Sequence, residues 1–467
     1  MNIEHGKEQR EGGHLEVSSE HCSAKLGRGA SAKEMPSHML VVDTGQPWVP
    51  EHEQCSPETQ EELDRLYRET IQHGIVDHHG IDSVVPVLPE GVRRRCSTNM
   101  IADFAPEVLA VIKDRGVSSV TSHFDSDLDS VSATYLAKAL VQSGDVARMP
   151  KITKSLAEFV HSVDFPSYLE TDPHKFSQSL LGIFGSVKTA IMGKQRVEMG
   201  RIWGDKAKTI DEKRRESGEA AGRYSQEVVD RSIEILNACE KISADSDIDF
   251  QQVDVEALDL SEKTRSLLVE GTEKTIEDFD KFNQEFERAE RAMARVKTKD
   301  GSMLDVPVII FENPDMDPLM VTNMSYIRVS PETIVAVFAG GERKYGGDHY
   351  DIGIKPETTA LYDLKSLEMP MNQVEEDLRQ DLFGNLETIV SGGQAPTAEQ
   401  QAILDQWKLS PEQLLNKWRA LRPGFEHTGH GDPSVVVAGG SLLAASTTSL
   451  MTPERFREIL AKQLETK

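Results

Sequence analysis

The chain has 467 residues, 28% of them charged, and a formal net charge of −26. A chain of this length is too long to fold around one ordinary hydrophobic core, so it predicts two or three domains. Because so negative a field repels a phosphate backbone, the composition argues against tight binding to long nucleic acids. It leaves room for a small anionic substrate, since metal cations can reverse the potential inside a pocket.

Cysteine usage and hydropathy indicate the compartment. The cysteines are Cys22, Cys55, Cys96 and Cys239, and no two of them have CxxC spacing. This pattern argues against a disulfide framework and a thiolate zinc site, and it favours a reducing compartment. No apolar run is long enough to cross a bilayer, and the N-terminus lacks the apolar core of a secretory signal. We therefore expect a cytoplasmic protein without a membrane partner.

Four segments differ in texture along the chain. Residues 1–37 are polar and rich in Gly and Ser, which predicts a disordered or loosely docked leader. Residues 38–194 alternate short apolar runs with helical stretches, as expected of an α/β domain with a mainly parallel sheet. Residues 195–300 are charged and helical in period, and predict a helical linking module. Residues 301–467 predict a smaller C-terminal α/β domain, with a hairpin at the glycine pairs of residues 339–355.

Within the second segment, strands and helices are expected to alternate. In chain order we predict a strand at 39–42, a helix at 57–73, a strand at 74–76, a helix at 97–115, a strand at 117–121 and a helix at 130–143. In parallel α/β sheets, ligands collect at the carboxyl ends of the strands. The acidic motifs of this chain fall at those positions.

Three predicted strand ends carry metal-ligand side chains. They are Asp43 in Val-Val-Asp-Thr-Gly, the run Asp77-His78-His79, and the segment from His123 through Asp127 to Asp129. Each motif alone has an ordinary explanation, such as a turn, a helix cap or a satisfied histidine. A calcium loop beginning at Asp125 is excluded, because Ser130 and Leu136 occupy the positions that need Gly and Glu.

The three motifs are more informative together. Several carboxylates at one edge of a sheet repel one another unless cations neutralise them. Mixed carboxylate and imidazole ligands favour Mn²⁺, with Co²⁺, Fe²⁺ or Mg²⁺ as alternatives. Two such ions about 3.5–4 Å apart can share an aspartate and support displacement at phosphorus. The pattern therefore predicts a metal-dependent hydrolase of phosphoester or phosphoanhydride bonds in a small phosphorylated substrate.

These motifs resemble those of the DHH phosphoesterase superfamily. Asp77-His78-His79 is similar to the motif that names it, and His123, Asp127 and Asp129 are similar to its HxxxDxD motif. Asp43 resembles its metal-bridging aspartate. In the family the HxxxDxD segment ordinarily comes first, whereas here it follows the other two. A permuted order can serve the same chemistry, because ligands have to meet in space and not in sequence.

The resemblance implies roles for these residues. One ion would be bound by His123, Asp127 and Asp43, and the other by Asp129, Asp43, His78 and Asp164. Asp164 equally suits a helix end before Pro166. His79 would face the substrate as a clamp or general acid, and Asp77 would orient an imidazole.

A glycine-rich segment in the last domain is similar to the family's substrate-gripping segment. It comprises Gly429, His430 and Gly431, which would contact a phosphate; a turn before a buried strand is the alternative. Arg93, Arg94 and Arg95 suit either anion binding or an ordinary surface patch.

Two other functions remain open at this point. One is a 3′-to-5′ exonuclease on short oligonucleotides or cyclic dinucleotides, and the other is a non-catalytic metal or nucleotide sensor. Homo-oligomer formation is also left open by the sequence.

Overall fold

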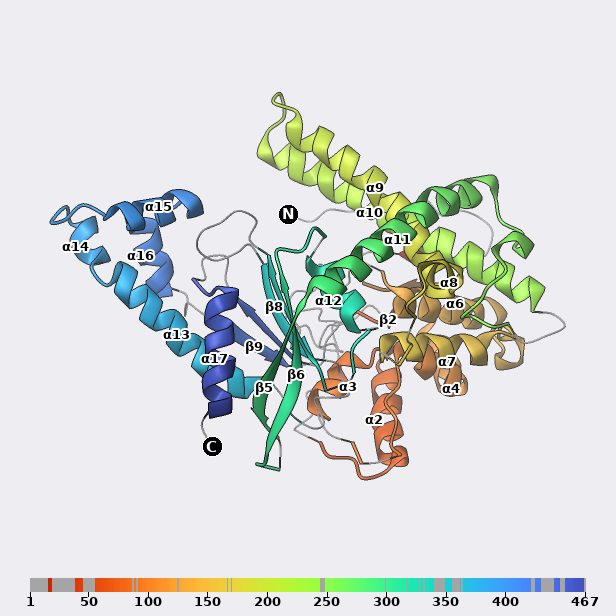
Figure 1. Ribbon diagram of the computed structural model, residues 1–467. Coiled ribbons are helices and arrows are strands. Elements are labelled where there is room, and N and C mark those ends of the chain that lie inside the picture. The colour runs from red at the N-terminus through yellow and green to blue at the C-terminus, as the bar shows by residue number, and fades with distance from the viewer. Residues whose placement is uncertain are drawn as a thin grey trace. The chain divides into compact units, whose positions relative to one another are not determined.

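A computed structural model shows a chain of two units, each built around its own sheet (Figure 1). The first unit comprises Met1–Asp164 and Asp172–Ile276, and the second comprises Phe165–Thr171 and Glu277–Lys467. The structure describes residues 16–18, 38–44, 55–85, 88–89, 91–123, 126–165, 167–168, 170–243, 248–298, 300–316, 318–326, 328–330, 332–339, 349–354, 362, 364–420, 425–429, 441–445 and 450–465. Mixed α/β architecture is thus confirmed.

The sheet of the first unit is parallel throughout. Its strands are β1 (Glu16–Ser18), β2 (Met39–Val42), β3 (Ile75–Val76) and β4 (Ser119–Thr121), in the order β1-β4-β2-β3. Strand β2 reads as a continuous apolar run because both of its faces are covered, and Leu40, Val41 and Val42 are fully buried. Since Val42 pairs with Val76 and Val41 with Thr121, the residues after β2, β3 and β4 emerge at one edge.

Helices follow β2, β3 and β4 in the chain. They are α2 (Gln60–Gln72), α3 (His79–Val84), α4 (Ser97–Asp103), α5 (Ala105–Arg115), α6 (Leu128–Ser143), the 3-10 turn η2 (Val146–Arg148), α7 (Thr153–Asp164) and α8 (Pro173–Gln178). The prediction of one helix at 97–115 is wrong, because the chain breaks at Phe104 into α4 and α5. Pro106 lies in the first turn of α5, where its missing N–H leaves no hydrogen bond unmade.

Long helices follow in the region predicted as a linking module. They are α9 (Leu180–Gly204), α10 (Ile210–Ile242), the 3-10 turn η3 (Val255–Ala257) and α11 (Glu262–Arg288). Helices α9 and α10 pack along each other (Figure 1). Helix α11 approaches α9 closely at Gly271, where an added Cβ would lie 1.8 Å from the carbonyl oxygen of Ser186. Only glycine permits that approach.

One part of the helical prediction is wrong. Residues Glu290–Lys297 form strand β5, not the end of a helix. Ala294 and Val296 are fully buried, whereas Arg295 between them points the other way and forms an ion pair with Asp305. This alternation matches the two-residue period of a strand, and pairing with β6 (Met303–Glu312) decides it.

In the described part of the second unit, six strands form a mixed sheet. After β5 and β6 come β7 (Ile334–Ala339), β8 (His349–Ile354), β9 (Phe425–Gly429) and β10 (Ser441–Ala445), in the order β5-β6-β7-β8-β10-β9. Strands β6 and β7 are parallel, with α12 (Pro318–Tyr326) between them in the chain. Strands β7 and β8 are antiparallel, which agrees with the predicted hairpin. The remaining helices are α13 (Lys365–Phe383), α14 (Leu386–Val390), α15 (Ala398–Trp407), α16 (Pro411–Ala420) and α17 (Pro453–Glu465).

Candidate metal centre

Asp43 lies at the centre of the acidic edge of the parallel sheet. Its backbone N–H donates to the carbonyl of Val76 at 2.9 Å, which extends the pairing of β2 with β3 by one residue. Its φ of +45° is in the left-handed region, so the chain turns sharply there. The side chain is buried at this turn, where it faces the histidines that follow β3 and β4.

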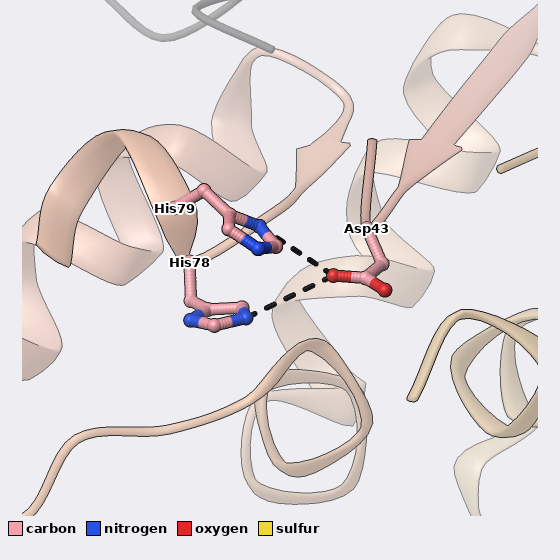
Figure 2. A group of neighbouring side chains, drawn as sticks. All are labelled: Asp43, His78 and His79. Carbon is pink, nitrogen blue, oxygen red and sulfur yellow. Dashed lines mark ion pairs between the residues drawn. The ribbon is translucent and has the colours of Figure 1, made fainter. Parts of the chain in front are cut away.

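The two carboxylate oxygens of Asp43 face different groups. Oδ1 lies 3.8 Å from His78 Nε2 and 3.6 Å from His79 Nδ1. Figure 2 shows the two rings facing this carboxylate. Oδ2 lies 3.6 Å from His123 Nε2. A carboxylate with one oxygen toward each of two ligand groups has the geometry needed to bridge two cations.

The first of these groups is formed by Asp43, His123 and Asp127, whose ligand atoms lie within 4.8 Å of one another. His123 Nε2 is 3.6 Å from Asp127 Oδ2. The other oxygen of Asp127 accepts from the backbone N–H of Ser130 at 2.9 Å and thereby caps α6. Helix cap and ligand are therefore compatible functions, because they use different oxygens.

The second group is formed by His78, Asp129 and Asp164, again within 4.8 Å. His78 Nε2 lies 3.5 Å from Asp164 Oδ2 and 4.0 Å from Asp129 Oδ2. Asp164 Oδ2 is closed to solvent and accepts no hydrogen bond from the residues that the structure describes. A buried anionic oxygen in this state is costly unless a cation or a proton neutralises it, so the donor set suits a divalent ion.

Asp129 also connects this group to α4. Its two carboxylate oxygens accept from the backbone N–H groups of Ser97 and Thr98, both at 2.8 Å. The hydroxyl of Ser97 donates to Asp43 Oδ1 at 3.1 Å. The polar start of α4 thus fixes two of the candidate ligands, and each oxygen of Asp129 retains a further lone pair.

Asp77 positions His79. Its Oδ2 accepts from the backbone N–H and the hydroxyl of Thr44, both at 2.9 Å. Its Oδ1 lies 2.8 Å from His79 Nδ1 and accepts from the backbone N–H of His79 at 3.0 Å. His79 remains 31% exposed, whereas Asp77 is buried. The imidazole is therefore held by Asp77 while part of it reaches solvent.

The proton affinities of these side chains reflect unbalanced buried charge. Burial and the nearby Asp43 carboxylate raise the pKa of Asp129 to about 6, and burial raises the pKa of Asp164 well above its usual value. Burial lowers the pKa of His78, but Asp164 and Asp82 outweigh it and raise that pKa well above normal. Without a cation, the site has to retain protons to offset its carboxylates.

No family model matches the chain, and neither the curated proteins nor the solved structures contain a match. None of the helices in the described part of the chain is both long and apolar enough to span a bilayer.

One participant in the site is absent from the sequence-based set. Asp82 Oδ2 lies 2.8 Å from His78 Nδ1, on the opposite side of the ring from the candidate ligands. Its spacing of four residues from His78, at the start of α3, is the signal that could have identified it.

The arginines near α4 serve the fold. Arg94 Nε lies 3.5 Å from Asp82 Oδ1, and an Arg94 guanidinium nitrogen donates to the carbonyl of Val85 at 2.7 Å. Arg95 pairs with Asp64 and with Asp103. These contacts occupy the two guanidinium groups with protein partners, which favours a structural role over anion binding.

The predicted substrate-gripping segment is only partly described. Gly429 is the last residue of β9, where it pairs with Ser441 of β10. His430 and Gly431 lie outside the described residues.

Proposed function

We propose that this chain is a two-metal-dependent hydrolase of phosphoester or phosphoanhydride bonds in a small phosphorylated substrate. The observation that carries the proposal is the position of Asp43, whose two oxygens face separate Asp/His groups. A single-ion site has no need for this arrangement, whereas a pair of ions sharing one carboxylate requires it. The DHH-like motifs support the same interpretation.

In this proposal each group holds one ion. His123, Asp127 and Asp43 would bind the first. His78, Asp129 and Asp164 would bind the second, together with Asp43, whose Oδ1 lies 3.8 Å from His78 Nε2. Oxygen and imidazole donors without thiolate favour Mn²⁺, with Co²⁺ or Mg²⁺ as alternatives. Bound ions would polarise the phosphoryl oxygens and offset the negative charge that develops at phosphorus.

His79 is the protein group that serves the substrate. Burial and the neighbouring His78 lower its pKa, but Asp77 and Asp43 outweigh them and raise it to about 9. Its partial exposure lets it meet a ligand from solvent. A protonated His79 can donate a hydrogen bond to a phosphoryl oxygen or deliver a proton to the leaving group, while Asp77 keeps the ring oriented.

The test measures the release of inorganic phosphate and of nucleotides in the presence of Mn²⁺, by the wild type and by Asp129→Asn. Asparagine keeps one acceptor oxygen for the start of α4, which makes it a sharper variant than alanine. Asp211→Asn is the matched control, because the Asp211 side chain is 95% exposed on α10. We expect the wild type and the control to release inorganic phosphate, and Asp129→Asn to lose that activity.

The outcomes separate the alternatives. Release of mononucleotides from short oligonucleotides, without inorganic phosphate, would replace the proposal by an exonuclease. Binding of Mn²⁺ and nucleotide without turnover would indicate a sensor. Equal turnover by the wild type and Asp129→Asn would refute the metal role of Asp129.

A further inference from the structure

His78 is held from both sides of its ring. Its Nε2 faces Asp43, Asp129 and Asp164, while its Nδ1 lies 2.8 Å from Asp82 Oδ2. Both His78 and Asp82 are buried. Because carboxylates accept hydrogen bonds, the Asp82 contact places a proton on Nδ1 and directs the lone pair of the neutral ring to Nε2.

We propose that Asp82 is a positioning residue that sets the affinity of the His78–Asp129–Asp164 group for its ion. This inference rests on the proposed function. Asp82 fixes the tautomer and the rotation of His78, so Nε2 meets an ion without a further ordering cost. Carboxylates that orient metal-binding histidines in this way raise the basicity of the ligating nitrogen.

Asp82 is itself fixed by two other side chains. Its Oδ1 accepts from the Tyr67 hydroxyl at 3.2 Å and lies 3.5 Å from Arg94 Nε. The hydroxyl of Tyr67 in turn accepts from the backbone N–H of Arg95 at 3.2 Å. The positive charge of Arg94 compensates the carboxylate, so a neutral His78 does not leave Asp82 as an isolated buried anion.

A purely structural role for Asp82 makes different predictions. If Asp82 only stabilised α3 and α4, its loss would weaken the fold and affect both ion sites equally. If it positions His78, its loss weakens one site, because His123 and Asp127 do not touch it. The experiment therefore compares the two ion affinities within one protein.

The variants are Asp82→Ala and Asp82→Asn, with Asp103→Asn as the control. Asparagine keeps an oxygen that can accept from Nδ1, whereas alanine removes the acceptor. Asp103→Asn removes a carboxylate from the same region, since Asp103 pairs with Arg95 at 2.7 Å, but it leaves His78 untouched. A calorimetric titration of each metal-free protein with Mn²⁺ measures both ion affinities.

We expect Asp82→Ala to bind one of two Mn²⁺ ions about 10- to 100-fold more weakly and the other with wild-type affinity. Asp82→Asn should lose less, and Asp103→Asn should match the wild type. Proton NMR of the metal-free wild type should show a hydrogen-bonded His78 Nδ1 proton, assigned by its loss in His78→Gln and absent in Asp82→Ala. This signal does not depend on any activity of the loaded protein.

Three results would overturn the inference. They are wild-type affinity for both ions in folded Asp82→Ala, an equal loss at both sites, or an Nδ1 proton that persists without Asp82. If Asp82→Ala does not fold, Asp82→Asn and Tyr67→Phe provide the test in its place. Wild-type Mn²⁺ affinity at both sites in both of these variants would then overturn the inference. A wild type that binds no Mn²⁺ refutes the proposed function itself, which is a separate outcome.

Discussion

Replacing Asp164 with asparagine separates two effects of this carboxylate: the destabilisation of the metal-free fold by a buried charge, and the stabilisation that a bound ion provides. Asp164 Oδ2 is buried, accepts no hydrogen bond from the described residues and lies 3.5 Å from His78 Nε2. Asparagine has nearly the same shape but no charge. The substitution therefore removes an anionic ligand, yet it breaks no hydrogen bond made to that oxygen by the described part of the chain.

The expected magnitudes follow from this contrast. Loss of one partner of a buried charged interaction costs roughly 3–5 kcal/mol, which corresponds to about a hundredfold to several thousandfold in ion affinity. At an ion concentration about 100 times the wild-type Kd, the ion stabilises the wild type by about 2.7 kcal/mol. In Asp164→Asn the same concentration would contribute at most about 0.4 kcal/mol from that ion.

Thermal unfolding with and without Mn²⁺ measures this difference. For a unit of this size, about 2.7 kcal/mol corresponds to a rise in Tm of roughly 5–10 °C in the wild type. Without metal, Asp164→Asn should be at least as stable as the wild type at pH 7, because burial and neighbouring carboxylates raise the pKa of Asp164 and disfavour its charge. Glu158→Gln, an exposed change on the same helix, is the control.

Two results would refute this reasoning. The first is an Mn²⁺-dependent rise in Tm as large in Asp164→Asn as in the wild type. The second is a metal-free Asp164→Asn that unfolds well below the wild type, which would show that the carboxylate supports the fold directly.

Other substitutions and conditions test the rest of the site. Asp43→Asn should weaken the binding of both Mn²⁺ ions, because each carboxylate oxygen of Asp43 faces a different group. Calorimetry that shows weaker binding of only one ion would contradict a bridging role for Asp43. His79→Gln should lower hydrolysis about 10²- to 10⁴-fold with Mn²⁺ affinity retained, and steady-state kinetics that show no loss would remove His79 from the chemistry. Because the pKa of Asp129 is raised to about 6 and that of His78 well above normal, protons compete with the ion. Mn²⁺ binding should therefore tighten as the pH rises through 6 and should release protons, which calorimetry in buffers of different ionisation enthalpy detects; a pH-independent Kd would argue against these ligands.

Local pattern was sufficient for much of the fold. Alternating apolar runs and helical stretches predicted β2, α2, β4 and α6, because strand and helix periods are properties of neighbouring residues. The local sequence pattern gave the wrong secondary structure where the pairing of strands decides it. Glu290–Lys297 continues a charged helical sequence, yet its alternate residues are buried against β6 and it forms a strand. The break at Phe104 agrees with Pro106, since a proline in the interior of one helix over 97–115 would remove a backbone hydrogen bond, whereas in the first turn of α5 it removes none.

For the site, the sequence by itself determined which chemical groups reach the edge of the parallel sheet. An apolar strand that ends in Asp43, Asp77 or His123 must deliver that side chain to its carboxyl end, because strand direction is fixed by the chain. Tertiary structure alone decided which atoms meet. The two directions of the Asp43 carboxylate and the capping of α4 by Asp129 depend on side-chain rotation and on the packing of segments far apart in sequence. No local period encodes these distances.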